Sequence, residues 1–204
     1  MNEVKFNKIL ISVNAILPLA FLAYDGTRGQ LGANPLEFFL RASGVLTLVF
    51  VLITLSVTPL RKIFGWNGLV KYRRMIGLYG FFYGCIHLIT YSIFDKGLDL
   101  TEIVEDVVLR PFIAIGMLAL VIMVPLAVTS TNGMIKRLGG KNWSRLHKLT
   151  YAVAVLGVIH FWMIVKSDIF YPAVFAVIVV LLLGFRLIQN FRVKPAAAKK
   201  QSIV

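Results

Sequence analysis

Three histidines are the residues of this chain whose type and placement could support chemistry, and all three lie in or at the edge of apolar runs. His147 and His160 lie near opposite ends of WSRLHKLTYAVAVLGVIHFWMIV, and His87 lies in GLYGFFYGCIHLITYSIF. An ionisable ring is costly to desolvate inside a membrane helix, so it seldom occurs there without a function. This placement predicts that the histidines are ligands for a group held between helices.

A short motif, Gly-x-Ile-His, occurs at both His87 and His160. In each copy the glycine, Gly84 or Gly157, lies about one helical turn before the histidine, where it could make room for a flat porphyrin. Gly80 and Gly84 also form a small-xxx-small pair, for which plain helix packing is an equally good explanation.

The composition indicates an all-α, polytopic membrane protein. Of 204 residues 58% are hydrophobic, and the mean hydropathy is +0.81, which is too apolar for a soluble domain of this length. The apolar runs are continuous rather than alternating, so helices are expected rather than a barrel. The net charge of +13 is more typical of basic cytoplasmic loops than of nucleic-acid binding in such a protein. Cys85 is the only cysteine, so no internal disulfide and no CxxCH motif for covalent haem are present.

Six transmembrane helices are predicted, each close to the roughly 20 residues that a bilayer requires. They are expected at about Lys8–Tyr24, Leu40–Val57, Tyr72–Phe94, Pro111–Val128, Trp143–Val165 and Tyr171–Phe191. The loops are too short for a second folded domain, so residues 1–194 are expected to form one transmembrane domain. Residues 195–204 are expected to form a basic, disordered cytoplasmic tail.

The loop charges alternate along the chain and predict its orientation. The second and fourth loops are basic, whereas the third, DKGLDLTEIVEDVV, is acidic. Because basic loops stay on the cytoplasmic side, both termini are expected in the cytoplasm. The acidic stretch is either a docking face for an outer partner or a solvated loop that lies on the membrane.

This orientation brings His87 and His160 to one depth near the outer side. Two such histidines suit bis-imidazole ligation of haem iron, which leaves no open position for oxygen and therefore favours electron transfer. For a single membrane histidine, a hydrogen bond to a neighbouring helix is the alternative. A zinc site would need carboxylates or further cysteines, and a proton relay would need a buried acid, all of which these spans lack.

His147 lies 13 residues before His160, about 20 Å nearer the inner side. Arg74 precedes His87 by the same 13 residues, so His147 is expected opposite Arg73 and Arg74. A second haem there would need another ligand; alternatively, the arginines bind haem propionates, a flavin phosphate or lipid headgroups. On an ideal helix His147 and His160 would be about 140° apart, so the helix must be irregular if both face one column of cofactors.

The pattern TSTNGMIKRLGGKNWSRLHKLTY, followed by GVIHFW, resembles the ferric-reductase-like transmembrane superfamily. ITLSVTPL, YRRMIGLYGFFYGCIHL and LRPFIAIGMLAL are similar to one family within it, MsrQ (also called YedZ). Its members are the haem-binding membrane subunits of bacterial MsrPQ systems, which reduce methionine sulfoxide in periplasmic proteins. The similarity extends from Gly32 to about Arg192. The short chain, the single histidine in the third span and the arginine pair are the features that mark MsrQ.

The resemblance implies one or two b-type haems, with His87 and His160 as iron ligands and His147 as a further candidate. It implies FMN as another cofactor, and Arg73 and Arg74 are the remaining candidate cofactor-binding residues. It implies electron flow from the quinone pool or a cytoplasmic flavin reductase to a periplasmic, molybdopterin-containing MsrP-like subunit. The chain would then be a redox subunit of the bacterial inner membrane, without catalytic residues of its own.

Two other functions fit parts of the sequence. A stand-alone ferric or quinone reductase belongs to the same class, and it would use the same histidines. A membrane transporter belongs to another class, but the spans show no inverted repeat and few intramembrane charges. No GxGxxG or other nucleotide-binding segment occurs, so an electron carrier of this kind receives its electrons from a separate molecule.

The predicted orientation can be tested by cysteine labelling in a Cys85→Ser background. A membrane-impermeant reagent applied from outside should label Thr101→Cys and leave Asn132→Cys unlabelled. The reverse pattern would overturn the orientation.

Overall fold

All six predicted apolar runs form helices long enough to cross a membrane in the computed structural model, which describes residues 2–165 and 167–200. The spanning segments are Glu3–Thr27, Pro35–Phe64, Arg73–Asp95, Pro111–Val128, Gly140–Ile164 and Phe170–Gln189. Within the described residues there is no strand. The predicted all-α architecture with six spans is therefore confirmed.

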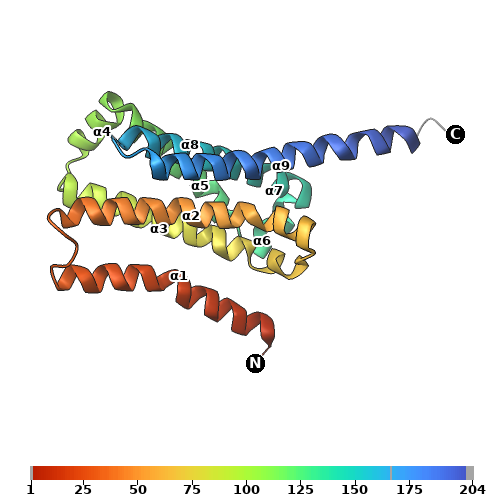
Figure 1. Ribbon diagram of the computed structural model, residues 1–204, viewed down its shortest axis with the longest axis horizontal. Helices are drawn as coiled ribbons and strands as arrows, with labels where there is room; N and C mark the ends of the chain where they lie inside the picture. The colour runs from red at the N-terminus through yellow and green to blue at the C-terminus, as the bar shows by residue number, and fades with distance from the viewer. Residues whose placement is uncertain (1, 166, 201–204) are drawn as a thin grey trace.

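Several of these segments are divided, and short helices connect them. The elements are α1 (Glu3–Thr27), α2 (Pro35–Phe64), η1 (Asn67–Lys71), α3 (Arg73–Thr90), the π-helical η2 (Tyr91–Asp95), α4 (Leu100–Leu109), α5 (Pro111–Val128), α6 (Asn132–Leu138), α7 (Gly140–Leu146), η3 (His147–Leu149), α8 (Thr150–Ile164) and α9 (Phe170–Lys200). In Figure 1, α4 lies at one end of the bundle, and α6 and α7 lie toward the other. The start of α1 and the end of α9 lie at the same end as α6 and α7.

Two helix pairs, α2 with α3 and α5 with α8, make the most extensive contacts in the bundle. Their shared core consists of aliphatic residues from α2, α5, α8 and α9, with Leu55 and Ala154 fully buried. Gly80 of α3 allows close approach to α2, because a Cβ there would lie 3.4 Å from Phe50 and Val51. Large apolar side chains remain exposed on the outer faces, as expected for helices whose solvent is lipid.

The first helix is the least buried of the spans, and Ala15 is its one buried residue. The buried Tyr83 hydroxyl of α3 donates a hydrogen bond of 2.6 Å to the Ala15 carbonyl. Asn7 also donates to the Tyr72 hydroxyl at 3.1 Å. These polar contacts hold α1 against the bundle at two depths.

Arg186 of α9 is a charged residue buried among the spans, and a proline in α2 explains its position. Pro59 has no N–H, so the carbonyl of Leu55 one turn earlier lacks its helical donor. The Arg186 guanidinium donates to this carbonyl and, at 2.9 Å, to the carbonyl of Leu182. Its Cζ also lies 5.2 Å from the centroid of the Tyr151 ring. Arg186 therefore supplies the hydrogen bond that α2 cannot make for itself.

The last helix, α9, continues to Lys200 and so includes part of the segment expected as a disordered tail. Residues 195–200 are helical, and residues 201–204 lie outside the described residues. The cytoplasmic placement of this segment stays a prediction.

The acidic stretch after the third span, expected as a loop, contains the helix α4. Asp99 begins it as an N-cap, accepting hydrogen bonds from the backbone N–H groups of Thr101 at 2.8 Å and Glu102 at 3.3 Å. The helix is amphipathic, with an exposed apolar stripe formed by Leu100, Val104 and Val108.

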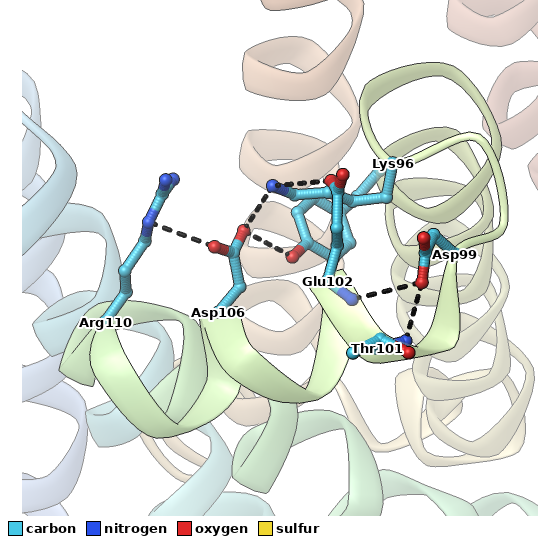
Figure 2. Close-up of polar contacts among 7 residues, drawn as sticks. Lys96, Asp99, Thr101, Glu102, Asp106 and Arg110 are labelled. Carbon is cyan, nitrogen blue, oxygen red and sulfur yellow. Dashed lines mark hydrogen bonds and ion pairs between the residues drawn. The ribbon is translucent and has the colours of Figure 1, made fainter.

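Asp106 on the inward side of α4 is the centre of an ion-pair cluster (Figure 2). Its carboxylate lies 2.8 Å from Lys96 Nζ and 3.1 Å from Arg110 Nε, and it accepts a 2.8 Å hydrogen bond from the Tyr91 hydroxyl. Because Asp106 is only 7% exposed, it is not available to an outer partner. A docking role for the acidic stretch must therefore use the exposed Glu102 and Glu105.

Asp106→Asn should weaken the attachment of α4 to the third span at neutral pH. The hydrogen bond from Lys96 holds the pKa of Asp106 below its ordinary value of 3.8. The stabilisation of α4 by the Asp106 carboxylate is thus fully present at pH values above that ordinary pKa. It is lost as the pH falls through the lowered pKa. Hydrogen exchange of the α4 amides should be faster in the variant at pH 7 and should become equal to wild type in strong acid. Glu105→Gln is the exposed control; equal exchange of Asp106→Asn and wild type at pH 7 would contradict the role of the cluster.

Candidate functional site

His87 of α3 is held against α2 through its Nδ1 atom. This nitrogen lies 3.0 Å from the Leu40 carbonyl oxygen and 3.3 Å from Ser43 Oγ. Because a carbonyl can only accept, Nδ1 carries the ring proton. The ring lies over Gly44, where a Cβ would come within 3.2 Å of it.

His160 of α8 is held against α5 in the same way. Its Nδ1 donates a 2.6 Å hydrogen bond to the Phe112 carbonyl. The ring lies so close to Gly116 that a Cβ there would come within 2.7 Å of it, closer than real Cβ contacts. Only glycine therefore fits at position 116 with His160 in this position.

The two sites share one local rule: the accepting carbonyl comes four residues before the glycine on which the ring rests. This holds for Leu40 and Gly44 in α2, and for Phe112 and Gly116 in α5. A residue without a side chain lets the imidazole approach the helix surface and reach the carbonyl one turn earlier. In both rings the Nδ1 proton is used, which leaves the Nε2 lone pair available to a metal.

The structure brings the rings of His87 and His160 close together, in an edge-on arrangement. Their centroids are 6.2 Å apart, and their planes are at 88°. Two metal–imidazole bonds of about 2 Å each, together with the ring atoms between nitrogen and centroid, span about 6 Å. The separation of the two rings is thus about the length that one metal held by both Nε2 atoms would require. The described residues hold no cluster of three or more His, Cys, Asp or Glu, so a site with three or four such ligands is not formed there.

The glycines of the Gly-x-Ile-His motif lie against leucines of neighbouring helices. A Cβ at Gly84 would lie 3.0 Å from Leu120 Cδ1, and a Cβ at Gly157 would lie 3.2 Å from Leu48 Cδ1. The contact at Gly84 agrees with the helix-packing explanation for Gly80 and Gly84, and room for a porphyrin beside the motif stays a prediction.

His147 lies where the helix of the fifth span is irregular. Such an irregularity was expected if His147 and His160, about 140° apart on an ideal helix, face the same column of cofactors. His147 begins η3, a 3-10 segment between α7 and α8, and its ring stacks on Trp143 with centroids 3.9 Å apart. Its Nε2 lies 3.1 Å from Thr129 Oγ1, whose own proton goes to the Pro125 carbonyl at 2.6 Å. Nε2–H is therefore the donor, and the free lone pair of His147 is on Nδ1.

A cavity beside His147 is lined by the other two residues named from the sequence, Arg73 and Arg74. Trp143, Lys148 and Tyr151 also line it, and no carboxylate does. Arg74 donates a 2.7 Å hydrogen bond to Asn132 Oδ1, which is neutral. The cavity therefore combines several positive charges with one histidine, a combination suited to a ligand with anionic groups.

Residues 40–158 match the family model described as "Ferric reductase like transmembrane component". Three curated relatives, each named "Protein-methionine-sulfoxide reductase heme-binding subunit MsrQ", match most of the chain. The protein from Herminiimonas arsenicoxydans is 48% identical over 88% of this chain and 83% of its own. That from Rhodospirillum rubrum is 46% identical over 92% and 90%, and that from Polaromonas naphthalenivorans is 49% identical over 88% and 83%.

This chain belongs to the MsrQ family. Together, the six apolar helices and the transmembrane family model make it an integral membrane protein. No solved structure matches the chain. The segment common to the ferric-reductase-like proteins contains His87 and His147 and ends two residues before His160.

The contact of His160 with Gly116 predicts a large effect of one methyl group. Gly116→Ala should destabilise the protein by about 1–3 kcal/mol, because the ring must move away from α5. Gly184→Ala is the matched control, since its Cβ meets nothing within 4 Å. Thermal unfolding in detergent should show a lowered Tm for Gly116→Ala and an unchanged or raised Tm for Gly184→Ala. A Gly116→Ala protein as stable as wild type would show that the ring is not confined against α5.

Proposed function

We propose that this protein is a transmembrane electron-transfer subunit that holds a b-type haem between His87 and His160. The facing imidazoles carry the proposal, since both Nδ1 protons are bound to backbone carbonyls and both Nε2 atoms are left for iron. The relatives named as heme-binding subunits support it. A haem bound there supplies a one-electron redox centre, and its two protein ligands leave no open position for oxygen.

In the proposed orientation, the His87–His160 pair lies near the outer face of the bacterial inner membrane. The pair contacts Leu40 and Phe112, early in α2 and α5, at the end of the bundle where α4 lies. The opposite end carries the basic η1, α6 and α7 segments. Basic segments face the cytoplasm in membrane proteins, so both termini are cytoplasmic.

The electron acceptor is a periplasmic, molybdopterin-containing MsrP-like subunit that reduces methionine sulfoxide in proteins. The shared name of the relatives, heme-binding subunit of a protein-methionine-sulfoxide reductase, supports a partner of this kind. The exposed Glu102 and Glu105 on α4 provide an acidic docking face. The electron donor is the quinone pool or a cytoplasmic flavin reductase. The chain itself is therefore the redox subunit and not the site of sulfoxide reduction.

The inner cavity holds a second redox cofactor, either FMN or a second haem. An electron from the cytoplasmic side must travel about 20 Å from the level of His147 to the level of His160, which is long for one direct step. Arg73 and Arg74 pair with the phosphate or propionate groups of that cofactor. His147 contributes its Nδ1 lone pair or stacks against the cofactor together with Trp143.

His87→Ala and His160→Ala should each abolish the same bis-histidine haem component, because both imidazoles ligate one iron. Reduced-minus-oxidised absorption spectra, with iron counted per chain, provide the measurement. His147→Ala is the control that should retain this component. A full bis-histidine spectrum in either of the first two variants would rule out the pairing.

His147→Ala and the double variant Arg73→Gln/Arg74→Gln should leave the outer haem intact and slow electron delivery from the inner side. Haem and flavin counts per chain distinguish the two cofactors, since the variants should lose either flavin or one haem. If both variants keep every cofactor and transfer electrons at the wild-type rate, the inner residues are lipid and packing contacts.

A further inference from the structure

We propose that Arg186 is a charge-tuning residue of the inner cavity, which raises the reduction potential of the cofactor bound there. This inference rests on the proposed inner cofactor. Arg186 itself was not among the residues that the sequence analysis singled out. Arg186 lies near the end of the last span, Phe170–Gln189, and is buried between helices. A charge buried among membrane helices is costly, so its presence calls for a partner and usually for a function.

Arg186 is separated from the cavity by a single side chain. Its guanidinium lies over one face of the Tyr151 ring, with 5.2 Å from Cζ to the centroid, and Tyr151 lines the cavity. Its second contact, the Leu55 carbonyl, belongs to the turn of α2 that also contributes Val51 and Thr54 to the lining. The positive charge is therefore fixed directly behind the cavity wall.

Among the described residues, the hydrogen-bond and cation–π partners of this guanidinium are neutral, and the nearby charge that acts on it, Arg73, is also positive. Two are backbone carbonyls, those of Leu55 and Leu182, and the third is the Tyr151 ring. None of the ion pairs among the described residues involves Arg186, and no acid lines the cavity. Arginine stays protonated in proteins, so the full positive charge persists in a weakly screening environment.

The consequence for a redox cofactor follows from Coulomb's law. Reduction adds one electron, and a fixed positive charge nearby stabilises the reduced form relative to the oxidised form. Arg73, Arg74 and Lys148 lie at the cavity surface, where water and anionic groups can screen them. Arg186 is 8% exposed and contributes a field that such groups do not neutralise. It therefore favours the arrival of an electron from the quinol or reduced flavin donor.

Arg186 also has a structural role, which the test must separate from its charge. Removing the guanidinium leaves the Leu55 carbonyl without a donor, so a single Arg186→Met variant could simply fail to fold. Pro59→Ala removes this difficulty, because the new backbone N–H at position 59 can donate to the Leu55 carbonyl. In the Pro59→Ala background, substitutions at Arg186 thus change mainly the charge.

The experiment compares three full-length proteins in lipid nanodiscs: Pro59→Ala, Pro59→Ala/Arg186→Met and Pro59→Ala/Arg186→Lys. Potentiometric titration followed by absorption spectra gives the midpoint potential of each redox centre, and thermal unfolding gives the stability. The Met variant should keep its Tm and its cofactors, and its inner centre should shift to a lower potential. The Lys variant should restore most of that potential. The midpoint potential of the outer haem should shift less in both the Met and the Lys variant, because the outer haem lies farther from position 186.

Two outcomes would overturn the inference in distinguishable ways. Equal potentials of the inner centre in the Met and Pro59→Ala proteins would show that Arg186 is only a hydrogen-bond donor, and the inner cofactor would stand. A Pro59→Ala protein and a wild-type protein that both titrate as one centre would remove the inner cofactor and this inference with it. The proposed outer haem would be unaffected by that result.

Discussion

A histidine inside a membrane must satisfy its ring N–H within the protein, because lipid tails accept no hydrogen bond. In this bundle the half-buried His87 and His160 meet that requirement with a backbone carbonyl of the neighbouring helix, Leu40 for His87 and Phe112 for His160. The bonds couple α3 to α2 and α8 to α5, which are also the two most extensively packed helix pairs. The hydrogen bonds that orient the two imidazoles are therefore also contacts between the helices that pack most closely.

Proline and glycine have complementary effects on the helix backbone here. Gly44 and Gly116 let an imidazole approach carbonyls that are already in a regular helix. Pro59 instead frees a carbonyl, and Arg186 from α9 occupies it. At the inner end the 3-10 segment at His147 interrupts the regular helix. His147 contacts Thr129 at the end of α5 and His160 contacts Phe112 near its start, so both histidines meet α5 despite their spacing. Each departure from a regular helix thus places a polar side chain at a site.

The six spans and the pairing of His87 with His160 were predictable because they follow from hydrophobic length and loop charge, both of which are local properties. The helix α4 was missed although Asp99 and the apolar stripe from Leu100 to Val108 are recognisable signals of a capped amphipathic helix. The supporting glycines were not predictable, because which glycine lies beneath a histidine depends on how two helices pack. Arg186 was overlooked for the same reason, since its acceptor is 131 residues away in the sequence.

The neutral partners of the two imidazoles have a consequence for protons as well as for electrons. A carboxylate partner would pull the Nδ1 proton and make the ring a stronger electron donor, whereas a backbone carbonyl is too weak a base to take the proton. For a metal held between them, as proposed, His87 and His160 would remain neutral imidazoles in both of its redox states. An electron that reaches such a metal would then require no proton movement at these two rings.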